Sequence, residues 1–144
     1  GRRIRKTDGV MEILLSEGSP DIVLTQKDVR EVQLAKGAIQ AGISSLLNLA
    51  GITADQLERV ILAGAFGNFI NKKSALRIGM LPKVPPEKII SVGNAAGSGA
   101  SMALLSQAER DRADRIAEAA IHVELSTLPG FQEEFLKAVS FPNE

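Results

Sequence analysis

The sequence predicts an α/β domain in which helices pack on a mixed sheet. Two short apolar runs, residues 60–63 and 89–92, each lead into a glycine-rich turn and then into a helical pattern. Two further apolar runs near the N-terminus are separated by a short polar linker. Strands that alternate with helices after an opening hairpin are typical of layered α/β folds. A chain of 144 residues is long enough for one domain, or for one lobe of a larger one.

The opening hairpin is predicted from residues 10–15 and 22–24. Both runs are apolar, and residues 16–20 between them include Gly18 and Pro20. Glycine and proline in a short polar linker favour a β-hairpin connection.

A long helix is predicted to follow the hairpin. Thr25 is a good N-cap, Asp28 places a carboxylate in the first turn, and Gly51 ends the run as a C′ glycine. About 25 helical residues would extend ~37 Å. Gly37 and Gly42 inside the helix each cost on the order of 1 kcal/mol relative to alanine, and we expect close packing onto a neighbouring strand to compensate. The apolar positions recur at helical spacing: Val29, Val32, Ala35, Ile39, Ile43, Leu46, Leu47 and Ala50.

The remaining elements are predicted from local signals. Thr53 caps one short turn, Asn71 caps a helix that Gly79 closes, and Phe135 and Leu136 face inward from a terminal helix. The predicted ranges are strands at 59–63, 88–92 and 122–125, helices at 71–78, 95–106, 107–121 and 131–139, and an irregular loop at 81–87.

Composition limits the function classes. The 17 basic and 17 acidic side chains balance, which argues against nucleic acid or an acidic membrane surface as partner. The basic group Arg2, Arg3, Arg5 and Lys6 is interpreted as a solvated edge rather than a binding arm. No apolar run reaches the ~18–20 residues that span a bilayer. The absence of cysteine excludes a disulfide, a thiolate nucleophile and iron–sulfur ligands within these residues.

Catalytic and metal-binding motifs are not evident. The one histidine, His122, is interpreted as a structural or surface residue, and no HExxH or carboxylate–histidine cluster predicts a metal site. The sequence identifies no catalytic residue.

The most informative segment is residues 59–71, where the apolar run 60–63 enters a turn with Gly64 and Gly67. The continuous apolar run predicts a strand buried on both faces. The glycines permit positive φ and let a ligand approach the backbone. This is the local architecture of a nucleotide site, although neither GxGxxG nor GxxxxGK[ST] is present.

A second glycine-rich segment, residues 93–101, runs directly into a helical pattern. Its small residues either let a helix pack closely against another backbone or contact a ligand, and the segment by itself does not decide between the two.

Taken together, five segments give the chain a family resemblance: residues 24–38 (LTQKDVREVQLAKGA), 64–67 (GAFG), 78–82 (IGMLP), 92–96 (VGNAA) and 123–126 (VELS), with Phe131 and Phe135 after them. The chain resembles the C-terminal part of the reductive activators of corrinoid proteins. These are iron–sulfur ATPases with an actin-like domain of the acetate kinase, sugar kinase, actin and DnaK-type (ASKHA) superfamily. The resemblance implies an actin-like ATPase (ribonuclease H-like) subdomain.

The resemblance also implies a larger parent protein. Residues 1–144 would be a single C-terminal ATPase subdomain excised from a longer chain, with a ferredoxin-like domain and the first ATPase lobe upstream. The full-length protein would bind ATP and Mg²⁺, hold a 2Fe–2S cluster in its upstream domain and none in this chain, and act in the cytoplasm within a methyltransferase system. Its function would be to return cobalt(II) corrinoid proteins, its partners, to the active cobalt(I) state. The resemblance does not decide whether the full-length protein forms a homodimer. The acidic catalytic residues would lie upstream, so these 144 residues alone are expected to be inactive.

By the same resemblance, Gly64, Ala65, Phe66 and Gly67 match the turn beside the ribose and α-phosphate of the nucleotide. Asn68 either hydrogen-bonds the ribose or base, or holds a left-handed backbone. Phe66 either stacks on adenine or belongs to the core.

Residues 93–99 match the segment that connects the lobes in the superfamily. Gly93, Asn94, Gly97 and Gly99 are therefore expected to pack at a hinge during domain closure. Gln33 and Lys36, one helical turn apart, either point at the nucleotide cleft or belong to a solvated stripe.

Two other functions stay open at this point. The chain is also compatible with one lobe of an actin-like-fold kinase that phosphorylates a small molecule, or with a nucleotide-sensing module that does not hydrolyse ATP. A ferredoxin cysteine set upstream would favour the reductive activator over the kinase, and ATP turnover would exclude the sensor.

Overall fold

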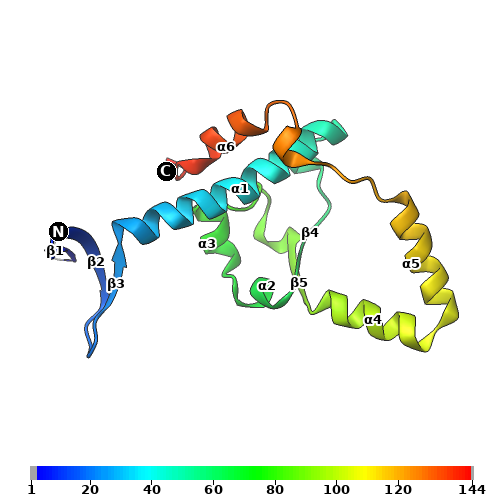
Figure 1. Cartoon of the computed structure of the whole chain (residues 1–144), viewed down its shortest axis with the longest axis horizontal. Coiled ribbons are helices and arrows are strands. Elements are labelled where there is room, and N and C mark those ends of the chain that lie inside the picture. The colour runs from blue at the N-terminus through cyan, green and yellow to red at the C-terminus, as the bar shows by residue number, and fades with distance from the viewer. Residues whose placement is uncertain (1–2, 144) are drawn as a thin grey trace.

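The computed structural model describes residues 3–143, except for the side chain of Phe66. Its central element is the long helix α1 (Gln26–Ala50). Figure 1 shows a small sheet at the N-terminal end of α1. Helix α6 lies along one side of α1, and a second sheet lies with α3 on the opposite side of α1. Helices α4 and α5 extend away from this body as an arm.

The N-terminal sheet has three antiparallel strands, β1 (Ile4–Thr7), β2 (Val10–Ser16) and β3 (Ile22–Thr25). The predicted β2–β3 hairpin is confirmed. Strand β1 was not predicted, although Asp8 and Gly9 supply the signal for it. Their φ angles of 49° and 85° are those of a two-residue hairpin loop with positive φ at both positions.

Helix α1 begins and ends where the sequence predicts. The Thr25 hydroxyl accepts a hydrogen bond from the Asp28 N–H, and the Asp28 carboxylate accepts one from the Thr25 N–H at 2.8 Å. Gly51 follows the helix with φ 66°. These reciprocal bonds satisfy backbone donors that the first helical turn leaves free.

Helix α6 (Phe131–Val139) packs along α1 and explains its two internal glycines. A Cβ on Gly37 would lie 3.2 Å from the Cα and N of Val139, and one on Gly42 would lie 3.4 Å from Cδ1 of Leu125. The prediction that these glycines pack onto a strand is therefore wrong, because their neighbours are α6 and the turn before it.

The second sheet consists of parallel strands β4 (Val60–Ala63) and β5 (Ile89–Gly93). The strands thus form two sheets rather than the single mixed sheet expected. Helix α2 (Ala65–Phe69) follows β4 directly, and Asn71 caps α3 (Lys72–Arg77) as predicted. Single 3-10 turns, η1 (Ala54–Gln56) and η2 (Pro86–Lys88), precede the two strands. The core cluster lies beside this second sheet and is formed by Ala75, Leu81, Val84 and Ile89.

Strand β4 is not buried on both faces within the described chain. Its residues alternate between half-buried and exposed, and Ile61 is 60 % exposed. The apolar run predicted the strand correctly, but nothing in residues 3–143 covers its second face.

The arm consists of α4 (Ala95–Leu105) and α5 (Gln107–Ala119). Ser106, with φ −141°, separates the predicted helical segments and caps α5. The predicted strand at 122–125 is wrong: the chain is irregular there and enters the 3-10 turn η3 (Leu125–Thr127). The exposed His122 side chain lies 3.9 Å from Glu124. Leu136 is 70 % exposed, so the prediction that it faces inward is wrong.

The molecule exposes 10790 Å² to solvent. A compact protein of 15.3 kDa would expose about 7,100 Å² by the usual scaling of surface with mass. Part of the excess is apolar, including Ile4, Leu15 and Ile22 on the N-terminal sheet and Leu104 and Leu105 on the arm. Within the described residues, no helix combines the length and apolar character needed to cross a membrane.

Candidate nucleotide-binding turn

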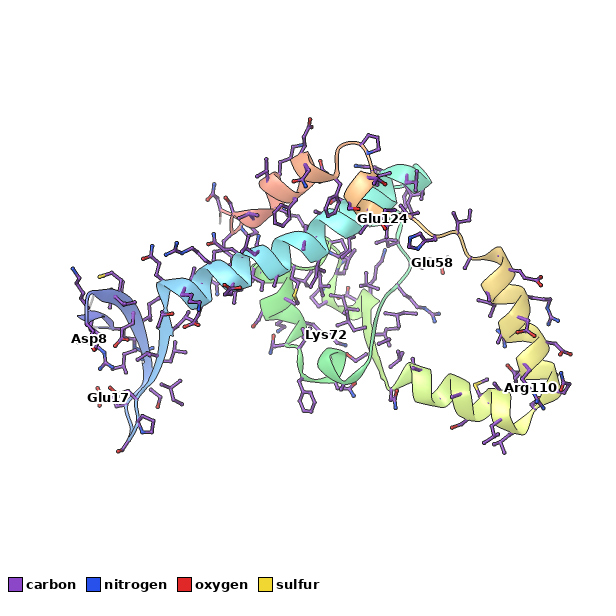
Figure 2. The ribbon with its side chains drawn as sticks, in the orientation of Figure 1. Asp8, Glu17, Glu58, Lys72, Arg110 and Glu124 are labelled. Carbon is purple, nitrogen blue, oxygen red and sulfur yellow. The ribbon has the colours of Figure 1, made fainter. Side chains whose placement is uncertain are left out.

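The two glycine-rich segments meet at the carboxyl ends of β4 and β5. The Gly64 N–H donates a hydrogen bond to the Gly93 carbonyl oxygen at 2.6 Å, where the register pairs Ala63 with Gly93. Lys72, at the start of α3, lies beside this sheet (Figure 2), and its ammonium donates to the Ile89 carbonyl at 2.7 Å. The ligand sites of open parallel sheets lie outside the carboxyl ends of their strands.

Gly64 has a backbone conformation that only glycine adopts readily. Its φ of 91° and ψ of 168° fall in the region that is essentially restricted to glycine. A Cβ built on Gly64 would have no atom within 4 Å. The space above Gly64 is therefore open to a ligand, as the sequence predicts for a backbone-approach site.

Gly67 has a different role. It is buried, and a Cβ there would lie 3.0 Å from Cβ of Leu62 and 3.1 Å from its carbonyl carbon. Its own carbonyl accepts a hydrogen bond from the Ser91 hydroxyl at 3.0 Å. Gly67 thus lets α2 lie close to both strands, which fixes the turn rather than opening it.

Asn68 connects the two segments. Its amide nitrogen lies 3.6 Å from where a Cβ on Gly93 would be. Among the described residues, the only non-glycine residue with positive φ is Asp8, so Asn68 does not hold a left-handed backbone. Of the two roles expected for Asn68, the ligand contact is the one that stays open. Ala65 is exposed at the start of α2, and the side chain of Phe66 lies outside the described residues.

Asn94 and Gly97 form the start of α4. The Asn94 side-chain oxygen accepts a hydrogen bond from the Gly97 N–H at 3.0 Å, which makes Asn94 the N-cap of the helix. A Cβ on Gly97 would lie 2.5 Å from the Asn94 amide nitrogen, so Gly97 accommodates this cap. Gly99 faces open space.

Lys36 has other partners. Its ammonium donates a hydrogen bond to the Ser140 carbonyl and lies 5.3 Å from the centre of the Phe141 ring. Burial lowers the pKa of Lys36. Gln33 is half-buried on the same helix and makes no side-chain hydrogen bond that the structure records within residues 3–143. The structure therefore brings together Gly64, Gly67, Asn68, Gly93 and Asn94, but directs the Lys36 ammonium to the C-terminal segment.

The residues of this turn can position a ligand, but they supply no acid, base or charge for catalysis. Residues 64–68 and 93–97 contain no ionisable side chain. They present backbone groups, two asparagine amides and unfilled space. Across the described part of the chain, no group of three or more histidine, aspartate or glutamate side chains is arranged to hold a metal ion.

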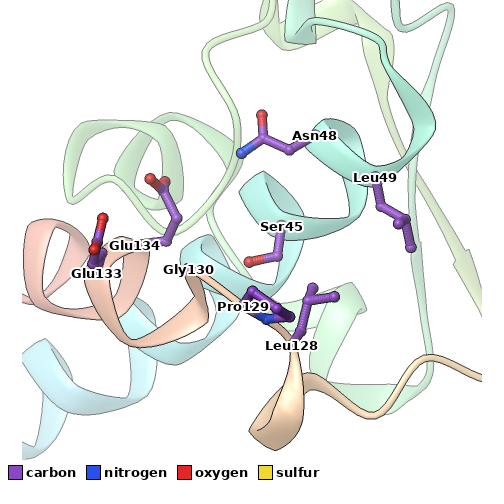
Figure 3. Close-up of a pocket in the computed structure, with 8 residues that line it drawn as sticks. All are labelled: Ser45, Asn48, Leu49, Leu128, Pro129, Gly130, Glu133 and Glu134. Carbon is purple, nitrogen blue, oxygen red and sulfur yellow. The ribbon is translucent and has the colours of Figure 1, made fainter.

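Two cavities border helix α1. An apolar one of about 250 Å³ lies between α1 and β4 and is lined in part by Ile39, Ile61 and Gly67. The other, of about 320 Å³, lies between α1 and the start of α6 (Figure 3). Ser45, Asn48, Glu133 and Glu134 supply its polar lining.

Comparison with known proteins identifies the family. Residues 1–144 match the profile described as the C-terminal domain of RACo, the ASKHA domain. The chain belongs to this family. The resemblance found in the sequence and the α/β fold class are thereby confirmed.

Named relatives agree with this assignment. The corrinoid activation enzyme RamQ of Eubacterium limosum is 45 % identical over 121 residues, which are 84 % of this chain and 20 % of the relative. The [Co(II) methylated amine-specific corrinoid protein] reductase of Methanosarcina barkeri is 32 % identical over 124 residues, 85 % of this chain and 23 % of the relative. A solved structure, a reductive activator for corrinoid, iron–sulfur protein, aligns with a TM-score of 0.85 and 35 % identity, over 99 % of this chain and 23 % of that one. The chain thus spans about a fifth of the length of the curated relatives it matches.

Proposed function

We propose that this chain is the nucleotide-binding lobe of an ATP-dependent reductive activator that returns cobalt(II) corrinoid proteins to cobalt(I). The observation that carries the proposal is Gly64. Its conformation is one that glycine alone adopts readily, its N–H is hydrogen-bonded to Gly93, and the space above it is open. The relatives' names support the reductive activation of a corrinoid protein, and the family resemblance supplies the use of ATP.

Gly64 would let the ribose and α-phosphate of ATP approach the backbone, because no Cβ occupies that space. Asn68 and Asn94 flank the approach from the two strands. Asn68 is free to donate to a ribose oxygen or an adenine ring nitrogen, whereas the Asn94 side-chain oxygen already caps α4. ATP with Mg²⁺ supplies the phosphoanhydride bond whose hydrolysis offsets an uphill electron transfer.

The rest of the full-length protein would complete the site. The turn lacks carboxylates, so the acidic residues that position Mg²⁺ and water would come from another lobe. The excess exposed surface supports such a lobe, since apolar side chains on the N-terminal sheet and on the arm have no partner within the described residues. The 2Fe–2S cluster would likewise lie in an upstream domain.

Helix α4 would act at the hinge between the lobes. Its first turns are built from alanine, glycine and serine, and none of its residues is buried. Small side chains let a helix pack closely against a neighbour and slide during closure. Closure of the lobes would exclude water from the phosphates during hydrolysis.

The test uses the full-length protein with its corrinoid protein in the cobalt(II) state and a low-potential electron donor. We expect cobalt(I), followed by its absorbance, to form only when ATP is present and hydrolysed. Cobalt(I) formation without ATP, or no cobalt(I) with it, would contradict the proposal. Phosphorylation of an added sugar or carboxylate would instead favour the kinase. The resemblance further implies a cytoplasmic location for this reaction.

A further inference from the structure

A separate cavity of about 480 Å³ lies where the C-terminal segment crosses α1. Helices α1 and α6 form two of its walls. The chain between Gly79 and Lys83 and the terminal segment from Ser140 to Asn143 complete it. None of the residues of the nucleotide-binding turn, 64–68, lines this cavity.

The cavity is cationic. Its charged lining residues are Lys36, Lys83, Lys137 and Glu134. Glu134 pairs with Lys137 at 3.0 Å. Lys36 and Lys83 have no carboxylate within ion-pair distance among the described residues, which leaves two uncompensated ammonium groups on one cavity. Lys36 is only 2 % exposed. A buried charge without a counter-ion is unfavourable, because protein surroundings solvate it less well than water does.

Polar groups in the same walls also lack partners. The Lys36 ammonium has three donors, and the structure gives it one acceptor, the Ser140 carbonyl, together with the face of Phe141. The buried side-chain oxygen of Gln40 accepts no hydrogen bond, while its amide nitrogen makes a long contact of 3.4 Å to the Ser44 hydroxyl. Buried polar atoms in native proteins are nearly always paired, so an orphaned acceptor calls for a donor from elsewhere.

The neighbouring cavity in Figure 3 has the opposite character. Its charged lining residues, Glu133 and Glu134, are both acidic. The interface of α1 and α6 therefore has an acidic end and a basic end. Only the basic end combines unpaired ammonium groups with an orphaned acceptor.

We propose that the basic cavity binds a small oxyanion that carries a hydroxyl group, either a hydroxycarboxylate or a protonated phosphate. The oxyanion would pair with the ammonium groups of Lys36 and Lys83, and its hydroxyl would donate to the side-chain oxygen of Gln40. Because Lys36 also holds Ser140, the bound anion would be linked to the C-terminal segment. The lowered pKa of Lys36 agrees with a buried ammonium that lacks an anion.

The test is calorimetric titration of the full-length protein, saturated with a non-hydrolysable ATP analogue and Mg²⁺ so that the γ-phosphate position is filled and a phosphate probe cannot enter the nucleotide site. The probes are inorganic phosphate, malate, and succinate, which is malate without its hydroxyl. We expect saturable binding of phosphate or malate, and the tighter of the two identifies the anion class. Succinate should bind more weakly than malate, and Gln40→Leu should remove that difference.

Two lysine variants locate the site. Lys36→Met should weaken binding about tenfold or more, because charge-assisted hydrogen bonds are the strong ones. Lys83→Met should weaken it several-fold, and since Lys83 is exposed this variant decides the matter even where Lys36→Met fails to fold. Lys27→Met, on an exposed lysine in the first turn of α1, should leave it unchanged. No saturable binding of phosphate or malate, or binding that Lys83→Met leaves intact, would overturn the proposal.

Discussion

Two buried glycines of α1 allow one substitution to be tested at two sites that differ only in their neighbours. Gly42→Ala should stabilise the helix, because alanine is favoured over glycine in a helix interior by about 1 kcal/mol. Its new Cβ would lie 3.4 Å from Cδ1 of Leu125, an ordinary contact with a side chain. Nothing in the surroundings opposes the gain.

Gly37→Ala brings the same gain in helix propensity, but its new Cβ would lie closer to the neighbouring atoms. Its Cβ would lie 3.2 Å from the backbone N and Cα of Val139, atoms that α6 holds in place. Overpacking of this kind typically costs about 1–3 kcal/mol. After the helical gain is subtracted, we expect Gly37→Ala to destabilise the interface of α1 and α6 by up to about 2 kcal/mol.

Hydrogen exchange, read by mass spectrometry on peptides from α1 and α6 of the full-length protein, measures both effects locally. Amide exchange in this region should slow about fivefold in Gly42→Ala, since 1 kcal/mol changes the opening equilibrium by that factor. It should become faster in Gly37→Ala. Equal slowing in both variants would refute the argument that α6 requires a glycine at position 37.

Two further predictions concern the hinge and the N-terminal sheet. Gly97→Leu would displace the Asn94 side chain that caps α4 and would place a large side chain where the hinge needs small ones. Because closure of the lobes is needed for hydrolysis, ATP turnover of the full-length protein should fall more than its ATP affinity. Normal turnover in a folded variant would reject the hinge. In the N-terminal sheet, the Arg5 guanidinium and the Thr7 hydroxyl hold the pKa of Glu12 below its usual range. This carboxylate therefore stabilises the sheet above its unfolded pKa, about 4, and that stabilisation is lost as the pH falls through the lower folded pKa. Protection factors of the β1 and β2 amides, which correct exchange for its intrinsic pH dependence, should fall on acidification in wild type and less so in Glu12→Gln; an equal fall in both would contradict this role of the carboxylate.

Local chemistry made several elements predictable. Thr25, Asp28 and Gly51 define the ends of α1 through bonds between near neighbours, and Asn71 does the same for α3. The glycine-rich turn at Gly64 could also be found, because a strand followed by glycine has a local signature. Strand β1 could have been found from Asp8 and Gly9.

Other features depend on contacts that the local sequence does not encode. Lys36 bonds to Ser140, 104 residues later, so its helical position alone could not distinguish this partner from a nucleotide cleft. Residues 122–125 have apolar strand character, but no strand pairs with them among the described residues, and they remain irregular. The predicted burial of Leu136 and of both faces of β4 fails for the same reason, since the described residues supply no covering surface there.

The central claim is that Gly64 lies against the nucleotide, and ATP affinity of Gly64→Val in the full-length protein tests it most directly. Gly9→Val is the matched control, because Gly9 also has positive φ, 85°, with no atom within 4 Å of its Cβ position, but lies in the β1–β2 turn. By calorimetric titration, Gly64→Val should lose affinity, since its branched side chain would fill the space of the ribose and α-phosphate. Gly9→Val should bind ATP like the wild type. Unchanged ATP affinity in folded Gly64→Val, or an equal loss in both variants, would contradict the account.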